Sequence, residues 1–308
     1  MASWDEILKE LGSVDSQIDQ VRKKYLAELH EYTGRNTIIY YSGWLKWPQA
    51  QNLDINDQDM GGFMNAIRNL DYSKGLDLIL HTPGGVPSAT EAIVRYLMDK
   101  FQKDIRVIVP QLAQSAGTMM ACAAKSIVMG KHSSLGPIDP QYQGIPAYNI
   151  VKEFEEAKYE LAKSPANIHF WNIRLSQYPA AFMKTAIDAI ELSEQLVKEW
   201  LKENMFFNEL EDETTKRETG LKIGTIVKAL IDREESKDHG RHFGYNYCKD
   251  LGLKIESLES DQQFQDKVLS VHHATTITID NTNTAKIIEN HLGRAFINST
   301  GFQGVQNV

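Results

Sequence analysis

Short apolar runs alternate with amphipathic stretches along the first half of the chain. Four runs rich in β-branched, aromatic and leucine side chains predict buried strands, at residues 37–41, 76–81, 105–109 and 127–129. Three stretches between them have the apolar spacing or the small-residue character of buried helices, at residues 57–70, 88–101 and 115–125. This alternation is typical of right-handed β-α-β units on a largely parallel sheet. The pattern therefore predicts an α/β core.

Helical spacing dominates both flanks of this core. Residues 3–31 carry an apolar stripe that predicts one long helix, packed either on another subunit or on its own domain. After Pro146 we expect helices at 147–163, 179–205, 220–231, 245–251 and 261–271, a loop at 234–241, a strand at 253–255, and a last segment of Thr-rich strand-like pieces with residues 286–291. The expected organisation has three parts: an N-terminal helix at 1–35, the α/β core at 36–146, and a helical extension with a C-terminal part at 147–308 that completes the same domain.

Composition narrows the class of protein. Of the 308 residues, 42% are hydrophobic and 24% are charged, which is typical of a globular chain. The formal net charge is -8 and no long Lys/Arg run occurs, which disfavours nucleic acid and anionic membranes as partners. Cys122 and Cys248 offer neither a metal spacing nor a disulfide framework, so we interpret them as buried thiols. The N-terminus lacks a signal-peptide pattern and no run of about 18 apolar residues occurs, so we expect a cytoplasmic protein.

A turn with two adjacent glycines follows the second predicted strand, in the segment His81-Thr82-Pro83-Gly84-Gly85-Val86. Adjacent glycines let the backbone approach a ligand and direct N–H groups at one point, which can stabilise an oxyanion. Pro-Gly-Gly is also common as a plain turn. The segment alone leaves both interpretations open.

A second loop, Gln111 to Thr118, follows the next β-α-β unit and opens a helix of small residues. Ser115 would lie at the helix N-terminus, where free N–H groups and the helix dipole favour negative charge. This position suits a nucleophile whose attack creates an oxyanion beside the Ala116 amide, although a serine there is also the usual N-cap. Both loops end at one edge of the sheet, where open α/β sheets bind ligands, and this convergence favours a functional site.

Three motifs together resemble the Clp-peptidase superfamily. They are Leu80-His81-Thr82-Pro83-Gly84-Gly85, Ser115-Ala116-Gly117-Thr118 and Ser134-Leu135-Gly136-Pro137-Ile138-Asp139-Pro140-Gln141. The order and spacing of the three are specific, and the resemblance extends from about residue 75 to the C-terminus. The chain is most similar to the group named serine dehydrogenase proteinase, which is related to signal peptide peptidase A.

The resemblance implies a Clp/crotonase-like α/β fold: a spiral β-α-β core with a helical extension. It also implies that Ser115 is the nucleophile of a serine peptidase. The oxyanion hole would come from backbone amides of the Gly84-Gly85-Val86 segment, at Gly85 or Val86, and from the amide of Ala116.

The sequence does not decide which residue is the general base. Clp peptidases carry a histidine downstream of the serine, where this chain reads Gly136-Pro137-Ile138-Asp139, and His132 lies too early. The missing histidine favours the Ser–Lys dyad of signal peptide peptidase A, in which burial or neighbouring groups must lower the pKa of the lysine. Lys152, in the helix that follows this loop, is the first candidate; Lys158 is the second and Lys163 the third.

His239 is the competing base. It precedes the predicted 245–251 helix, where Clp peptidases carry their third triad residue, and Asp238 or Asp139 would orient it. A solvated surface position is the alternative interpretation both for His239 and for Lys152.

The expected reaction is hydrolysis of a peptide or protein substrate by a homo-oligomer without cofactor or metal. His272, His273 and His291 match no standard metal spacing, and no phosphate-loop motif is present. One rival is an acyl-CoA-binding crotonase-type enzyme with the same two-loop oxyanion hole, although such enzymes need no nucleophile at Ser115. The other rival is a non-catalytic peptide-binding scaffold of the same fold.

Overall fold

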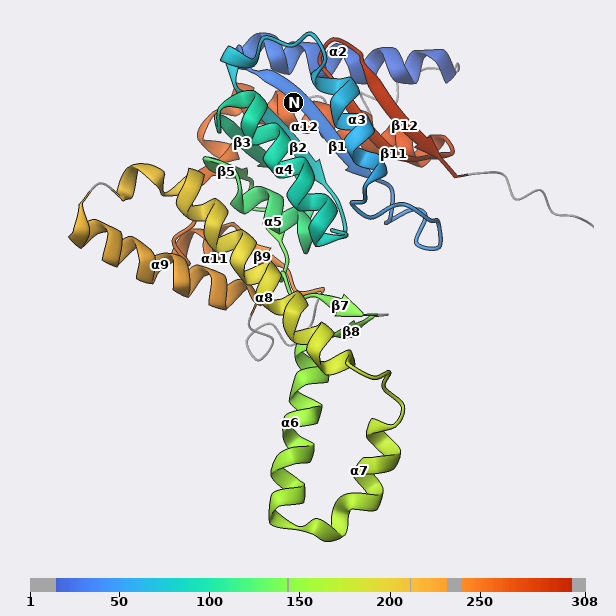
Figure 1. Cartoon of the computed structure of the whole chain (residues 1–308). Helices are drawn as coiled ribbons and strands as arrows, with labels where there is room; N and C mark the ends of the chain where they lie inside the picture. The colour runs from blue at the N-terminus through green and yellow to red at the C-terminus, as the bar shows by residue number, and fades with distance from the viewer. Residues whose placement is uncertain (1–14, 143, 211, 232–239, 301–308) are drawn as a thin grey trace, which may run out of the picture.

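The computed structural model describes residues 15–142, 144–210, 212–231 and 240–300 (Figure 1). A seven-stranded sheet forms its centre, in the order β10-β5-β3-β2-β1-β11-β12. The bounds are β1 Asn36–Ser42, β2 Leu76–His81, β3 Ile105–Val109, β5 Ser126–Met129, β10 Ile255–Ser257, β11 Thr284–Asn290 and β12 Ala295–Ser299. Strands β10 to β1 pair in parallel, as the alternation of elements predicts, whereas β11 is antiparallel to both β1 and β12.

Helices cover both faces of this sheet (Figure 1). On one face lie α3 (Gln58–Ile67), α4 (Pro87–Phe101) and α5 (Ala116–Cys122); on the other lie α2 (Asp15–Thr33) and α12 (Gln262–Asn281). In β1, Ile38 and Tyr40 face the first layer while Ile39 and Tyr41 face the second. Successive strand residues point to opposite faces, so a sheet covered on both sides needs the continuous apolar runs seen in the sequence.

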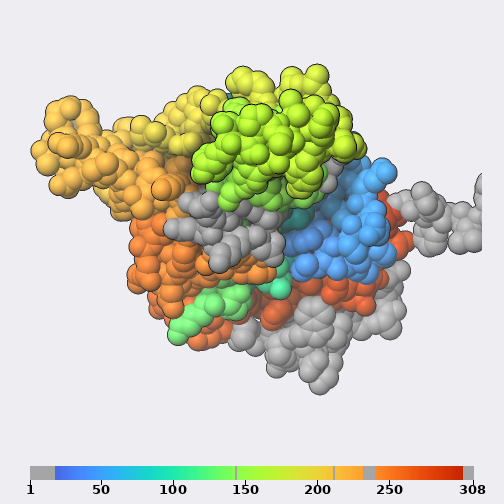
Figure 2. All heavy atoms as spheres, turned by 90° about the horizontal axis from the view of Figure 1, so that it is seen from below, coloured from blue at the N-terminus to red at the C-terminus, as the bar shows by residue number. Residues whose placement is uncertain are grey.

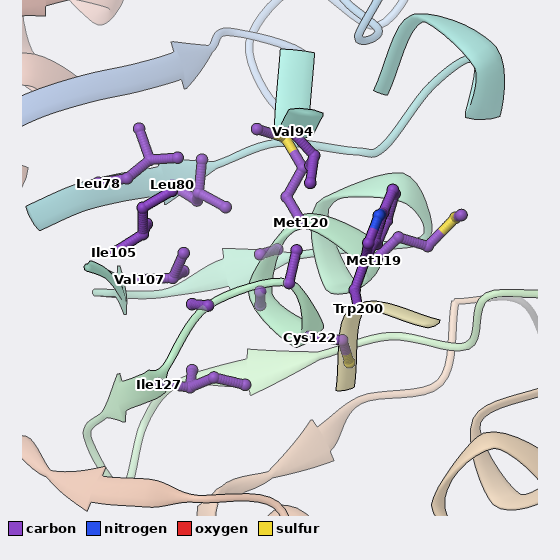
Figure 3. Packing of buried hydrophobic residues seen from close by; sticks show 14 of the residues in the cluster. Leu78, Leu80, Val94, Ile105, Val107, Met119, Met120, Cys122, Ile127 and Trp200 are labelled. Atoms are coloured by element: carbon purple, nitrogen blue, oxygen red, sulfur yellow. The ribbon is translucent and has the colours of Figure 1, made fainter. Parts of the chain in front are cut away.

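The first core cluster joins the central strands to α5 and to the end of α8 (Phe182–Trp200). Figure 3 shows Leu78, Val107 and Ile127 on neighbouring strands to the left of Met120, with Trp200 beside Met119. Trp200 is 1% exposed. Helix α5 is therefore packed between the sheet and α8.

A helical arm extends from this body (Figure 1). It consists of α6 (Ala147–Lys163), α7 (Ile168–Leu175) and the first part of α8. A small apolar cluster around Ala147, Ile150 and Ala186 packs α6 against α8. Helix α9 (Glu213–Ile231) projects to the side of the body (Figure 1). Figure 2, a view from below, shows the helical arm in front of the body.

Two small sheets lie between the body and the arm. One has the order β4-β6-β9, formed by Leu112–Ala113, Ser134–Leu135 and Phe243–Gly244. The other pairs β7 (Gln141–Tyr142) with β8 (Ile145–Pro146), directly before α6. Helix α11 (Tyr245–Asp250) follows β9. These short strands connect the residues around Ser115 to the start of the arm.

The predicted N-terminal helix packs on its own domain in the described part, residues 15–33. Val21, Tyr25, Leu26 and Leu29 are buried against the second face of the sheet. This contact accounts for the apolar stripe within residues 18–29, and the earlier part of the predicted helix lies outside the described residues.

The strand-like prediction for the Thr-rich last segment is wrong for residues 272–281, whereas Thr284 begins strand β11. Helix α12 continues to Asn281, and the hydroxyls of Thr275, Thr276 and Thr278 donate to carbonyl oxygens four residues earlier, at 2.7–2.8 Å. These bonds satisfy buried hydroxyls inside a helix, so β propensity did not decide the structure. Both cysteines are free and buried, as predicted. Among the described helices, none has the length and apolar character that a bilayer span requires.

Candidate active site

Ser115 lies between the short strand β4 and helix α5. Its backbone has φ 50 and ψ -116, a conformation that residues with a side chain rarely adopt. It occupies the N-cap position of α5, but its side chain makes no capping hydrogen bond. The structure therefore removes the plain N-cap interpretation, and a strained residue at such a position is typical of a functional site.

The glycine turn packs directly against Ser115. A Cβ atom at Gly84, whose φ is 101, would lie 2.6 Å from Ser115 Cβ. A Cβ atom at Gly85 would lie 2.2 Å from the Ile55 nitrogen. No larger residue fits at either position, so the two glycines are required for this close approach.

Backbone hydrogen bonds decide which amides of the turn are available. The Gly84 N–H donates to Thr82 Oγ1 at 3.2 Å, and the Val86 N–H donates to the Ile55 carbonyl at 2.8 Å. Within the described residues, the N–H groups of Gly85 and Ala116 have no hydrogen-bond acceptor. Of the four amides predicted for an oxyanion hole, Gly84 and Val86 are thus engaged inside the fold.

The third motif holds the start of α5 in place. Thr118 Oγ1 lies 2.9 Å from the carbonyl oxygens of Ala113 and Gly136 and accepts from the Gly136 N–H at 3.0 Å. Thr118 is fully buried, so these bonds form in a protected environment. The three motifs that are separate in the sequence therefore meet at one point.

A cavity of about 300 Å³ opens beside Ser115. Its walls come from the glycine turn, α5, the segment from Ile138 to Tyr142, and one side of α8. Its lining residues are Asp54, Pro83, Gly84, Gly85, Pro87, Ser115, Met119, Ile138, Pro140, Gln141, Tyr142, Ala189 and Ser193. Most of the walls are apolar, and the volume is sufficient for one side chain of a bound peptide.

None of the predicted bases lines this cavity in the described part of the chain. Lys152 is an exposed residue of α6 with Nζ 6.0 Å from the Tyr148 ring centroid. Lys158 is exposed and pairs with Glu155 at 2.6 Å, and Lys163 contacts Tyr159. His132 is exposed, whereas Asp139 is buried between two cavity-lining residues.

The other histidine candidate, His239, lies outside the described residues, as does Asp238.

His81, which opens the glycine turn, is buried next to Trp44 and His272. Burial lowers the pKa of His81 to about 3, against the opposing effect of a hydrogen bond with the Leu112 backbone. Burial likewise lowers the pKa of His272 well below its ordinary value. Both rings are therefore neutral at pH 7, and His81 serves as a packing residue under the turn.

This burial predicts acid sensitivity. Since the pKa of His81 is about 3 in the folded chain and about 6.5 in the unfolded chain, only the unfolded chain binds the proton between these values. The free energy of unfolding should then fall by about 1.4 kcal/mol per pH unit, from this residue alone, as the pH drops from 6.5 towards 3.

Urea titrations at pH 7 and pH 4.5 measure this loss. His81→Phe should make the drop in the free energy of unfolding between these two pH values smaller by about 2–3 kcal/mol. His169→Phe, at an exposed position of α7, should leave that drop unchanged. Equal losses in wild type and His81→Phe would contradict the assignment.

Several site residues have no signal in the sequence. Ile55 forms a bridge with the glycine turn, and Ala189 and Ser193 reach the cavity from a helix far along the chain. Ser193 is 1% exposed, and its hydroxyl has no hydrogen-bond partner among the residues that the structure describes. Only Ile55, which with Leu53 interrupts an otherwise polar stretch at 51–59, could have suggested a buried contact.

Comparisons with known proteins agree with this geometry. The chain is 42% identical over 102 residues to the uncharacterized protein MJ0137 of Methanocaldococcus jannaschii, which is 33% of this chain and 35% of that protein. It is 38% identical over 100 residues to the uncharacterized protein MJ1495 of the same organism, with 32% and 34% covered. The matched segments thus span about a third of these curated relatives.

A wider match covers the fold and the site together. The family described as ClpP-like SDH-type serine proteinase matches residues 13–256. That range contains the parallel strands β1, β2, β3 and β5, the first two residues of β10, the glycine turn and Ser115. The chain therefore belongs to the ClpP-like SDH-type serine proteinases.

Proposed function

We propose that this protein is a cytoplasmic serine peptidase that hydrolyses peptide bonds through an acyl-enzyme on Ser115. The observation that carries the proposal is the strained, uncapped Ser115 beside a cavity and next to two uncommitted amides. Membership of a serine proteinase family supports the same reaction. A spiral crotonase-like arrangement of the core belongs to the proposal, and the small β4-β6-β9 sheet beside the main sheet supports it.

The proposed reaction has two stages. Ser115 Oγ attacks the peptide carbonyl, its proton passes to the general base, and the carbonyl oxygen becomes an oxyanion held by the N–H groups of Gly85 and Ala116. The base then protonates the leaving amine as the C–N bond breaks. Water hydrolyses the resulting ester and regenerates Ser115.

We propose Lys152 as the base. Helix α6 begins directly at the cavity wall, because the Ala147 N–H donates to the carbonyl of cavity-lining Pro140 at 2.9 Å. Lys152 lies in the second turn of this helix, and its long flexible stem can turn towards the cavity once it leaves Tyr148. His239 is the alternative, and mutation distinguishes the two.

Turnover assays test the proposed reaction. Wild-type protein should hydrolyse fluorescent casein or members of a peptide library and should not turn over acyl-CoA thioesters. Acyl-CoA turnover without peptide hydrolysis would favour a crotonase-type enzyme. Peptide binding with no turnover of either substrate would favour a non-catalytic scaffold.

We also propose that the chain is a homo-oligomer. The helical arm carries exposed apolar side chains, with Phe170 56% and Ile173 71% exposed on α7. Apolar surface of this kind on a projecting element is typical of a protein contact. Sedimentation velocity at micromolar concentration should show a species larger than the 34.9 kDa monomer. A single species at the monomer mass would contradict the proposal.

A further inference from the structure

A buried ion pair holds the loop that packs against the glycine turn. Lys286 on β11 and Asp59 on α3 are both 0% exposed, and Lys286 Nζ lies 2.8 Å from Asp59 Oδ1 and 3.0 Å from Oδ2. Tyr40 Oη donates to Asp59 Oδ2 at 2.8 Å. A fully buried pair is costly to desolvate, so its geometry has to be well satisfied by further hydrogen bonds.

The remaining bonds of this pair go to the loop before α3. Lys286 Nζ donates to the Asp54 carbonyl at 2.7 Å, and Asp59 Oδ2 accepts from the Asn56 N–H at 3.1 Å. The two residues on either side of Ile55 are therefore held by the two members of one ion pair. Ile55 itself is 0% exposed.

Ile55 in turn holds the glycine turn. Its N–H donates to the Gly84 carbonyl and its carbonyl accepts from the Val86 N–H, both at 2.8 Å. The backbone at Gly84 leaves no room for a Cβ atom against Ser115. A continuous chain of contacts thus runs from the ion pair through Ile55 and Gly84 to the proposed nucleophile.

We infer that Lys286 and Asp59 are positioning residues for the oxyanion hole. They fix Ile55 on both sides, and Ile55 fixes the N–H of Gly85 relative to Ser115. The kinetic effect expected from this inference rests on the proposed function. The ordering of the loop 54–56 can be measured without any assay of activity. A displaced donor weakens binding of the transition state more than binding of the substrate, so the effect should appear in kcat.

The chain offers a matched control on the same strand. Glu289 of β11 pairs with Arg22 of α2 at 2.6 Å, and both are 0% exposed. This second pair lies on the opposite face of the sheet, among the residues of α2 and α12, and makes no bond to the loop 54–56. It therefore reproduces the burial and the charge of the first pair without the link to Ser115.

The experiment compares two double variants in which each ion pair becomes apolar at similar volume. Asp59→Leu/Lys286→Met should lower kcat for peptide hydrolysis about 10- to 100-fold, with KM within about threefold of wild type. Arg22→Met/Glu289→Leu should keep kcat and KM within about threefold. Equal kcat in the first variant, or equal losses in both, would overturn the inference.

Amide hydrogen exchange followed by mass spectrometry gives an independent measure. In wild type, the amides of Ile55, Asn56 and Val86 should be protected like core amides, and in the Asp59/Lys286 variant they should exchange at least about tenfold faster. Fast exchange at these amides in wild type would overturn the inference even if that variant fails to fold. If the wild-type protein hydrolyses no peptide, the proposed function is contradicted. The exchange rates would still show whether Lys286 and Asp59 hold the loop 54–56 and the glycine turn in place.

Discussion

Ser115→Ala is expected to abolish peptide hydrolysis, with a loss of roughly 10⁴-fold or more in kcat, because no other group forms the acyl-enzyme. The melting temperature should stay close to that of wild type. Ser115 makes no capping bond whose loss would cost stability, and alanine is smaller than the residue it replaces. Turnover of fluorescent casein and a thermal melt on the same preparation measure both effects.

Ser164→Ala is the matched control for this substitution. Ser164 is an exposed serine at the C-terminal end of α6 and does not line the cavity. It should retain full activity. A well-folded Ser115→Ala protein with wild-type turnover would end the assignment of Ser115 as nucleophile.

Lys152→Ala is expected to have the second largest effect, a loss of about 10²-fold or more in kcat, because a serine hydroxyl is a weak nucleophile without its base. Lys158→Ala is the control from the same helix. Lys158 is exposed and paired with Glu155, so its removal should change turnover little. Steady-state kinetics of the two variants at one pH make the comparison.

The pH profile distinguishes a lysine base from a histidine base. A lysine acts only when deprotonated, so activity should rise with pH through an alkaline midpoint. A histidine base would give a midpoint near 6 to 7. If His239→Ala is inactive while Lys152→Ala keeps near wild-type turnover, the dyad is replaced by a Ser–His mechanism.

Much of the fold could be predicted because the core strands are buried on both faces. Apolar runs at 76–81 and 105–109 predict β2 and β3 with the bounds that the structure shows. The antiparallel strands β11 and β12 could not be placed, since their position beside β1 depends on contacts far away in the sequence. Lys286, Glu289 and Asn290 make β11 look polar, yet each is fully buried with a distant partner.

The candidate site could likewise be predicted only in part. The two loops could be predicted to meet, because the carboxyl ends of parallel strands share one edge of a sheet, and the contact of Gly84 with Ser115 confirms that they do. Which amides stay uncommitted could not be predicted. The availability of the amides depends on Ile55, whose carbonyl accepts a hydrogen bond from the Val86 N–H. No local sequence pattern predicts this contact between two separate loops.

Reaction with a fluorophosphonate probe, followed by peptide mass spectrometry, tests the central claim most directly. Such a probe forms a covalent bond only with a serine whose hydroxyl is activated as a nucleophile. The account predicts one adduct per chain, located on Ser115, and no adduct in Ser115→Ala. An adduct on a different residue, or peptide hydrolysis by a protein that forms no adduct, would contradict it.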